Sequence, residues 1–85
     1  MYKILIVEDD MVIAESMKKS LCQWNYETEY IKDFKDVTAQ FIKFDPHLVL
    51  LDISLPFFNG YHWCSEIRKI SSVPIIFISS MSDNM

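Results

Sequence analysis

The sequence contains little glycine and little cysteine: Gly60 is its only glycine, and Cys22 and Cys64 are its only cysteines among 85 residues. Two distant cysteines provide neither a disulfide framework nor the ligand pairs of a zinc site. We therefore expect both to be reduced thiols in the core. The sequence also lacks an apolar segment typical of a signal peptide, and no apolar stretch is long enough to span a bilayer. A cytoplasmic protein without membrane contact is expected.

Positive charge is scarce as well. Lysine and arginine number 8 against 12 acidic residues, for a net charge of −4. A nucleic-acid-binding surface needs clustered Lys and Arg, so we expect no DNA contact from these residues. With 51% apolar and 24% charged residues, the composition is that of a folded globular protein. A chain of 85 residues accommodates one small domain and excludes two.

Apolar runs alternate along the chain with helical patterns. The runs at residues 3–7 and 47–51 are continuous, which is typical of strands covered by helices on both faces. Elsewhere apolar residues recur at helical spacing, which indicates amphipathic helices. The pattern predicts strands over residues 3–7, 27–31, 47–51 and 73–78, and helices over residues 11–24, 34–44 and 61–70. This alternation predicts an α/β fold with a doubly wound parallel sheet.

The helical patterns also predict individual side-chain roles. Asp33 is placed to cap the second helix, and Pro46 ends it. The third helix is expected to turn Tyr61, Cys64 and Ile67 toward one face. The apolar residues expected in the core rather than in contact with a cofactor are Met11, Met17, Phe34, Phe41 and Phe44.

Acidic and hydroxyl side chains directly follow the predicted central strands. These residues are Glu8, Asp9, Asp52, Ser79 and Ser80. In an open parallel sheet, ligands bind beyond the carboxyl ends of the strands. If the first and third strands are neighbours, three carboxylates meet there, and their mutual repulsion makes a bound cation necessary for full ionisation. Oxygen ligands of this kind suit Mg²⁺, and an aspartate such as Asp52 can accept a phosphoryl group.

Each of these residues also has a simpler interpretation. Asp9 and Asp10 can cap the first helix, and for Asp10 we expect this role. Asp52 can be a solvated acid at the start of a loop. Ser79 and Ser80 can be ordinary turn residues.

Four segments, taken together, resemble the receiver domains of two-component response regulators. Two of them are the strand with its acidic pair at residues 4–9 and the strand with its terminal aspartate at residues 48–52. The third is the pair Pro56 and Gly60, four and eight residues after that aspartate. The fourth is residues 73–80. Each segment is weak evidence by itself, but four in order across nearly the whole chain are specific.

The resemblance implies a flavodoxin-like fold with strand order 2-1-3-4. In such domains a further helix, strand and helix follow, so we expect residues 1–85 to be a receiver domain truncated before them. Residues 75–78 would then form an exposed apolar edge, for which we expect association between strand edges or a homodimer. The lysine that pairs with the phosphoryl group in such domains has no counterpart here, because no lysine follows Lys69.

The resemblance also implies roles for individual site residues. Asp52 corresponds to the phospho-acceptor, and Asp9 and Asp52 correspond to direct Mg²⁺ ligands. Glu8 corresponds to the acid that acts on the metal through water, and the backbone carbonyl of Ser54 completes the metal site. Ser79 corresponds to the switch hydroxyl, which turns toward the phosphoryl group after transfer.

The implied function is a phosphorylation-dependent signalling switch rather than a conventional enzyme. A sensor histidine kinase would donate the phosphoryl group, and the phosphorylated domain would control an output domain outside this chain. By resemblance, that output is DNA binding of the winged-helix kind, in transcription regulation.

Two alternatives stay open. A magnesium-dependent aspartyl phosphatase places a general-acid aspartate two residues after its nucleophile, where this chain has Ser54. A degenerate receiver-like interaction module would not need its acids, whereas Glu8, Asp9 and Asp52 are all present.

Two further features have expected roles outside this pocket. Phe57 and Phe58 lie in the loop after Asp52, where an exposed aromatic pair can contact the kinase. His47 precedes a strand and has no partner at metal-ligand spacing, so we expect a surface or turn role.

Overall fold

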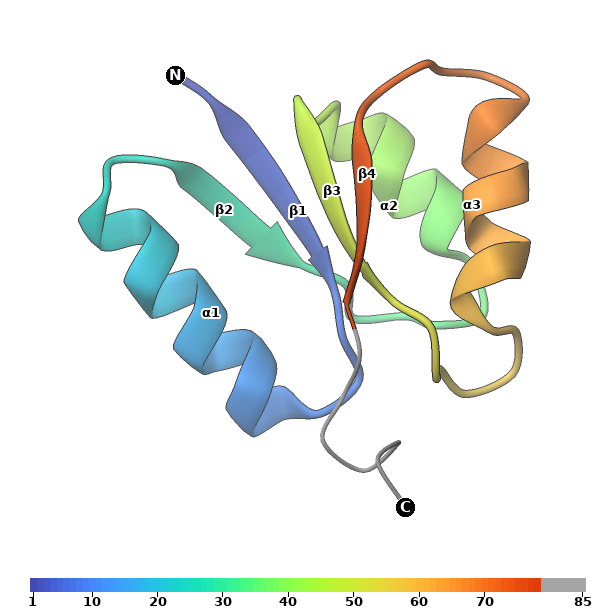
Figure 1. Cartoon of the computed structure of the whole chain (residues 1–85), viewed down its shortest axis with the longest axis horizontal. Helices are drawn as coiled ribbons and strands as arrows, with labels where there is room; N and C mark the ends of the chain where they lie inside the picture. The colour runs from blue at the N-terminus through green and yellow to red at the C-terminus, as the bar shows by residue number, and fades with distance from the viewer. Residues whose placement is uncertain (79–85) are drawn as a thin grey trace.

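The computed structural model describes residues 1–78, in which strands and helices alternate (Figure 1). The elements are β1 (Lys3–Val7), α1 (Met11–Gln23), β2 (Glu27–Tyr30), α2 (Val37–Phe44), β3 (Leu48–Asp52), α3 (Gly60–Arg68) and β4 (Ile75–Ile78). Every predicted element is therefore present in the predicted order. None of these helices is both long and apolar enough to cross a membrane.

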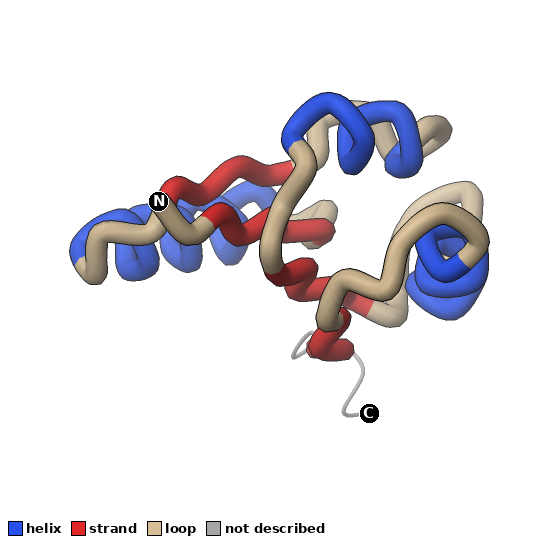
Figure 2. Tube along the Cα trace, turned by 90° about the horizontal axis from the view of Figure 1, so that it is seen from above, coloured by secondary structure: helices blue, strands red, loops and turns tan. Residues whose placement is uncertain are grey.

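The four strands form one parallel sheet in the order β2-β1-β3-β4, as expected. Helix α1 covers one face of this sheet, and α2 and α3 cover the other, which is visible when the molecule is seen from above (Figure 2). β1 and β3 are the two central strands, with Val7 aligned to Leu51. The doubly wound α/β fold is confirmed.

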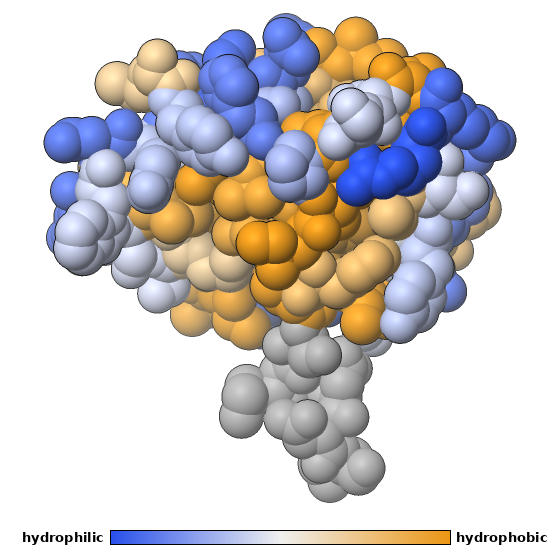
Figure 3. All heavy atoms as spheres, turned by 45° about the horizontal axis from the view of Figure 1, so that its top comes forward, coloured by the Kyte–Doolittle hydropathy of each residue, from blue (hydrophilic) through white to orange (hydrophobic). Residues whose placement is uncertain are grey.

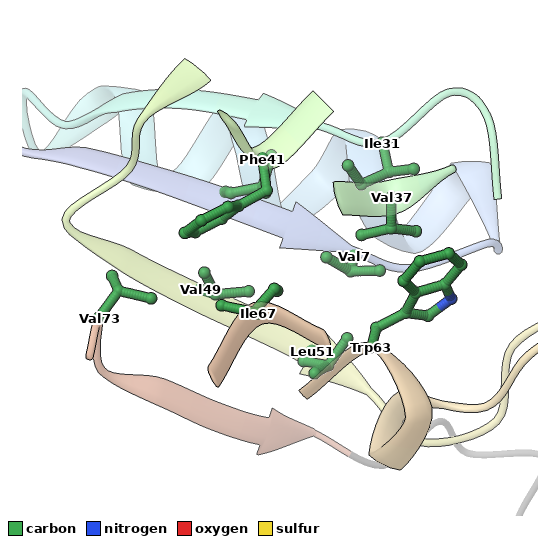
Figure 4. Packing of buried hydrophobic residues seen from close by; sticks show 10 residues of the cluster. Val7, Ile31, Val37, Phe41, Val49, Leu51, Trp63, Ile67 and Val73 are labelled. Carbon is green, nitrogen blue, oxygen red and sulfur yellow. The ribbon is translucent and has the colours of Figure 1, made fainter. Parts of the chain in front are cut away.

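The main core lies between the sheet and the helices α2 and α3. Because successive strand side chains point to opposite faces, alternate residues of β1 and β3 enter this core. Figure 4 shows these strand residues packed against residues of α2 and α3. The buried members of the cluster are Leu5, Val7, Ile31, Val37, Phe41, Val49, Leu51, Trp63, Ile67 and Val73.

The opposite face of the sheet is only partly covered. Helix α1 packs against β2 and β1, and an apolar groove beside it is lined in part by Leu48 and Leu50 of β3. Apolar side chains also gather in the middle of the face drawn in Figure 3. At the β4 edge, Ile76 is 52% and Phe77 39% exposed. The predicted exposed apolar edge is thus confirmed for these two residues.

The start of α2 differs from the prediction. The helix begins at Val37 with Asp36 as its N-cap, so the assignment of Asp33 as the cap was wrong. Asp33 instead lies in the preceding loop, where the side chain of Gln40 accepts the backbone N–H groups of Lys32 and Asp33 at 2.9 and 3.2 Å. The amide nitrogen of Gln40 donates to the carbonyl oxygens of Asp33 and Asp36 at 2.7 and 2.8 Å. These hydrogen bonds hold residues 32–36 outside the helix.

The buried face of α3 is also rotated from the predicted one. Trp63 and Ile67 are buried, whereas Tyr61 is 58% exposed and Cys64 only partly buried. The close contact of Gly60 with the end of β3 sets this orientation, since Trp63 and Ile67 share a helix face with Gly60.

The core predictions for α1 and α2 were partly right. Phe41 is buried, and Phe34 and Phe44 pack against the cluster from partly buried positions. Met17 is partly buried. Met11 is 46% exposed, so its assignment to the core was wrong. Cys22 is a free thiol, as expected, but it is exposed rather than in the core.

Candidate functional site

The candidate site lies where the two central strands end. Parallel pairing aligns Val7 with Leu51, so the residues that follow them in the chain are brought to the same edge of the sheet. Glu8 is 2% exposed and Asp52 is fully buried, whereas Asp9 is exposed. Two of the three acids therefore lie at the margin of the core, where an ionised carboxylate is costly without a compensating charge.

The three carboxylates converge as the sequence predicted. Glu8, Asp9 and Asp52 each offer one oxygen atom, and these oxygens all lie within 4.8 Å of one another. The residues come from two strands separated by more than forty positions in the chain. Because all three carry the same charge, this arrangement favours either a bound proton or a bound cation.

Glu8 has the most perturbed ionisation in this cluster. The pKa of its carboxyl group is raised to about 7, chiefly by burial and also by the charges of Asp52 and Asp9 and a side-chain hydrogen bond with Asp52. The backbone N–H of Asp10, which donates to Oε2 of Glu8 at 3.0 Å, acts in the opposite direction. At neutral pH in the metal-free protein, the carboxyl group of Glu8 is therefore protonated about half of the time.

The loop that follows β3 orients Asp52. Its Oδ1 atom accepts the backbone N–H of Ser54 at 3.2 Å. The loop closes when the N–H of Gly60 donates to the carbonyl oxygen of Ile53 at 2.8 Å. The side chain of Asp52 is thus fixed by its own loop, and Ser54 contributes to the site through its backbone.

Asp10 has the capping role that the sequence predicted. Its Oδ1 atom accepts the N–H groups of Val12 and Ile13 at 3.0 and 3.3 Å, at the start of α1. The cap satisfies backbone donors that the first turn of a helix leaves without partners. Of the two aspartates that follow Glu8, it is therefore Asp9 whose carboxylate lies near those of Glu8 and Asp52.

The donor set fits Mg²⁺ better than a softer metal. All three groups offer carboxylate oxygens, which are hard ligands, and a small number of protein ligands is typical of Mg²⁺ in phosphoryl-transfer sites. The raised pKa of Glu8 shows that the buried charges need neutralisation. The residues present therefore fit a divalent cation that takes oxygen ligands.

The other predicted site residues lie around this cluster or outside the described part. Phe57 and Phe58 are exposed, at 66% and 46%. His47 is exposed, accepts the N–H of Lys3 at 2.9 Å through Nδ1 and stacks on Tyr2, so its turn role is confirmed.

The switch hydroxyl was predicted at Ser79. Ser79 and Ser80 lie outside the described residues. Sequence reasoning missed Lys35, whose Nζ atom lies 5.1 Å from the centroid of the Phe57 ring. A lysine in another loop carries no local signal for such a contact.

Comparison with known proteins gives one family. The family model for the response regulator receiver domain matches residues 4–85. The transcriptional regulatory protein YvcP of Bacillus subtilis, itself uncharacterised, is 47% identical over 85 residues. This match covers 100% of the chain and 36% of YvcP, so the chain spans about a third of this curated relative.

Two solved structures agree with this match. The N-terminal domain of NsrR, a lantibiotic response regulator involved in nisin resistance, is 47% identical with a TM-score of 0.87, over 100% of this chain and 72% of that one. The response regulator TrrA of Thermotoga maritima, solved with Mg²⁺ and BeF, is 31% identical with a TM-score of 0.85, over 98% of this chain and 73% of that one. TrrA has also been solved in complex with the histidine kinase ThkA.

Proposed function

This chain belongs to the receiver domains of two-component response regulators, and from that premise we propose that Asp52 accepts a phosphoryl group from a sensor histidine kinase. The observation that carries the proposal is the convergence of Glu8, Asp9 and Asp52, with oxygens within 4.8 Å of one another at the ends of β1 and β3. Asp52 ends a buried strand, and the loop that follows it orients its carboxylate through the N–H of Ser54.

The transfer reaction is a displacement at phosphorus. An oxygen of the Asp52 carboxylate attacks the phosphorus of phosphohistidine, the P–N bond breaks, and the electron pair of that bond leaves with the imidazole of the kinase. The product is an acyl phosphate on Asp52. The N–H of Ser54 donates to Oδ1 of Asp52 at 3.2 Å, which helps to orient the attacking carboxylate.

Mg²⁺ would be held by Asp9 and Asp52 directly, by Glu8 through water and by the backbone carbonyl of Ser54. When bound, it neutralises charge on the carboxylates and on the transferring phosphoryl oxygens. Glu8 then stays ionised at neutral pH, because the nearby positive charge opposes the effect of burial on its pKa. The side chain of Asp10 caps α1, and its backbone N–H donates to the carboxylate of Glu8.

The signalling consequences extend the proposal beyond the described residues. Ser79 would bond the phosphoryl group after transfer, and the altered surface would control a DNA-binding output domain outside this chain. YvcP is described as a transcriptional regulatory protein, which supports this output. The exposed Ile76 and Phe77 support a receiver domain whose sheet continues beyond β4. The proposed location is cytoplasmic, as is typical of response regulators.

The test is intact-protein mass spectrometry after incubation with acetyl phosphate and Mg²⁺. The samples are this chain, a chain extended to a complete receiver domain, and both with Asp52→Asn. We expect the mass of one phosphoryl group on the wild-type chains, absent with EDTA and absent from Asp52→Asn. Labelling of only the extended chain would make residues beyond 85 necessary for the chemistry. Labelling of neither would refute the phospho-acceptor and favour a degenerate interaction module.

The same experiment addresses the phosphatase alternative. An aspartyl phosphatase needs a general acid two residues after the nucleophile, and Ser54 cannot supply one at neutral pH. We therefore expect the phosphoryl group to remain on Asp52 rather than to turn over. Rapid catalytic release of phosphate from acetyl phosphate would favour the enzyme instead.

A further inference from the structure

The loop between β3 and α3 is closed on Asp52 at both of its ends. It leaves β3 directly after Asp52, and it returns at Gly60, where a Cβ atom would lie 2.3 Å from the carbonyl oxygen of Asp52. Phe57 is three residues from Gly60, so its Cα lies within about 12 Å of the Gly60 Cα. The loop therefore begins and ends beside the proposed phospho-acceptor.

Phe57 stands in this loop in an unfavourable backbone conformation. Its φ is 69°, in the left-handed region that bulky residues rarely adopt. Its side chain is 66% exposed, so burial of the ring does not compensate for this conformation. Backbone strain at a position with no packing benefit is found preferentially at functional sites. The position thus presents an aromatic ring to solvent where glycine would fit more easily.

Lys35 contacts the ring of Phe57, and the adjacent Phe58 packs against residues of α3. Lys35, from the loop before α2, places its Nζ atom 5.1 Å from the centre of the Phe57 ring. Phe58 stacks on His62 with centroids 4.4 Å apart and meets the ring of Trp63 edge-on at 5.6 Å. Trp63 is buried, which ties this part of the loop to the core (Figure 4). We name Lys35, Phe57 and Phe58 the Phe57 patch.

We propose that the Phe57 patch is a contact site for the phosphodonor protein and contributes to its choice of donor. The inference rests on the proposed function of Asp52. Phosphoryl transfer requires the donor atom to come within about 3.5 Å of the acceptor oxygen, so a protein donor must cover the entrance of the site. The loop that carries Phe57 begins and ends beside Asp52, and exposed aromatic rings are enriched at protein interfaces.

The chemistry of the patch defines the surface it recognises. The Phe57 ring offers apolar area to an apolar side chain of the donor, and Lys35 offers a charge to a carboxylate beside it. Such a pairing sets specificity, because a donor with a positive charge at that place would be repelled. A small phosphodonor such as acetyl phosphate brings no protein surface to the domain, so we expect its reaction to be independent of the patch.

The test separates these two donors. The variants are Phe57→Gly, which removes the ring and relieves the backbone, and Lys35→Glu, which reverses the charge. Trp24→Ala is the matched control, because this aromatic residue is 76% exposed but follows the end of α1, away from the site. The protein donor is the sensor kinase of the same organism that, after autophosphorylation, labels the wild-type protein fastest.

We expect kcat/KM for transfer from this kinase to fall about tenfold or more in Phe57→Gly and in Lys35→Glu, as for a typical interface anchor. Labelling by acetyl phosphate should stay within about twofold in all variants, and Trp24→Ala should resemble wild type with both donors.

The remaining outcomes separate this inference from the proposed function. Unchanged kinase transfer in Phe57→Gly, or no transfer from any kinase while acetyl phosphate labels Asp52, would overturn the inference alone. Absence of acetyl phosphate labelling from both wild-type chains, this one and the extended one, would overturn the proposed function. A change in self-association in Phe57→Gly, measured by sedimentation, would assign the patch to a second copy and overturn the inference.

Discussion

Gly60 lies against the backbone of Asp52: a Cβ atom at Gly60 would be 2.3 Å from the Asp52 carbonyl oxygen and 2.9 Å from the Cα of Ile53. Such separations are far below van der Waals contact, and the neighbouring atoms are backbone, which cannot move aside like a flexible side chain. The first turn of α3 is therefore pressed onto the end of β3. The only glycine of the chain is needed here for close approach rather than for a positive φ.

The change Gly60→Ala should lower the free energy of unfolding by about 2 to 3 kcal/mol, because the added methyl group forces β3 and α3 apart. This loss outweighs the gain of up to about 1 kcal/mol from the higher helix propensity of alanine. Urea unfolding measures the change. Ser65→Ala, at an exposed position of the same helix, is the control and should change stability by less than about 0.5 kcal/mol. Equal stability of the two variants would contradict the close packing.

The role of Asp10 as a cap predicts different results for two substitutions. Asp10→Ala should lose about 1 kcal/mol of stability, because the N–H groups of Val12 and Ile13 lose their acceptor. Asp10→Asn keeps a side-chain oxygen and should retain most of that stability. Thermal unfolding in EDTA measures both. If both variants lost Mg²⁺ binding completely, Asp10 would be a metal ligand rather than a cap.

The raised pKa of Glu8 predicts a pH-dependent stability of the metal-free protein. Between its ordinary value of 4.5 and about 7, the folded protein keeps a proton that the unfolded chain has lost. The stabilisation is therefore complete below 4.5 and is lost as the pH rises through 7. The total loss is on the order of 3 to 4 kcal/mol, since each pH unit between the two pKa values contributes about 1.4 kcal/mol. Urea unfolding in EDTA across this range measures it.

The control for this prediction is Glu8→Gln, which cannot ionise. Subtracting its pH profile from that of the wild type isolates the contribution of Glu8 from those of other groups. Saturating Mg²⁺ should remove the difference, because the cation favours the ionised carboxylate at every pH in the range. A Glu8→Gln profile parallel to wild type in EDTA would show that the pKa of Glu8 is not raised.

The proposed Mg²⁺ ligands predict a contrast between Asp9 and Ser54. Asp9→Asn should weaken Mg²⁺ binding by about tenfold or more, because it removes a charged ligand. Ser54→Ala should leave the affinity within about twofold, because only the backbone of Ser54 is expected to contribute. Isothermal titration calorimetry at pH 8 compares them with wild type. A large loss in Ser54→Ala would place its hydroxyl group in the metal site.

Gln40 should control the local stability of the loop before α2. Its side-chain amide bonds to backbone groups of Lys32, Asp33 and Asp36. Gln40→Ala should lower the free energy of unfolding by about 1 to 2 kcal/mol, because these hydrogen bonds are lost. The loss stays this small because the bonds are exposed and water can replace part of them. Hydrogen exchange should speed up at the N–H groups of Lys32 and Asp33 while Ala39 stays protected by its cap. Unchanged exchange at both would show that the loop is held by other contacts.

The order of the elements could be predicted because it depends on local patterns. Continuous apolar runs and helical spacing are visible in any short window, and they identified all elements of residues 1–78. The start of α2 could not be predicted in this way. Both Asp33 and Asp36 are competent caps, and the choice between them is made by Gln40, which reaches back to the loop. The face of α3 depended similarly on the contact between Gly60 and Asp52.

For the candidate site, the sequence by itself determined which acids are available: Glu8 and Asp9 follow one apolar strand and Asp52 ends another. Only the tertiary structure decided that they meet, because the parallel pairing of β1 with β3 brings distant segments to one edge. The same packing buries Glu8 and raises its pKa, and it places Lys35 beside Phe57. Residue type is encoded locally, whereas distance, burial and charge environment arise from contacts between segments far apart in the chain.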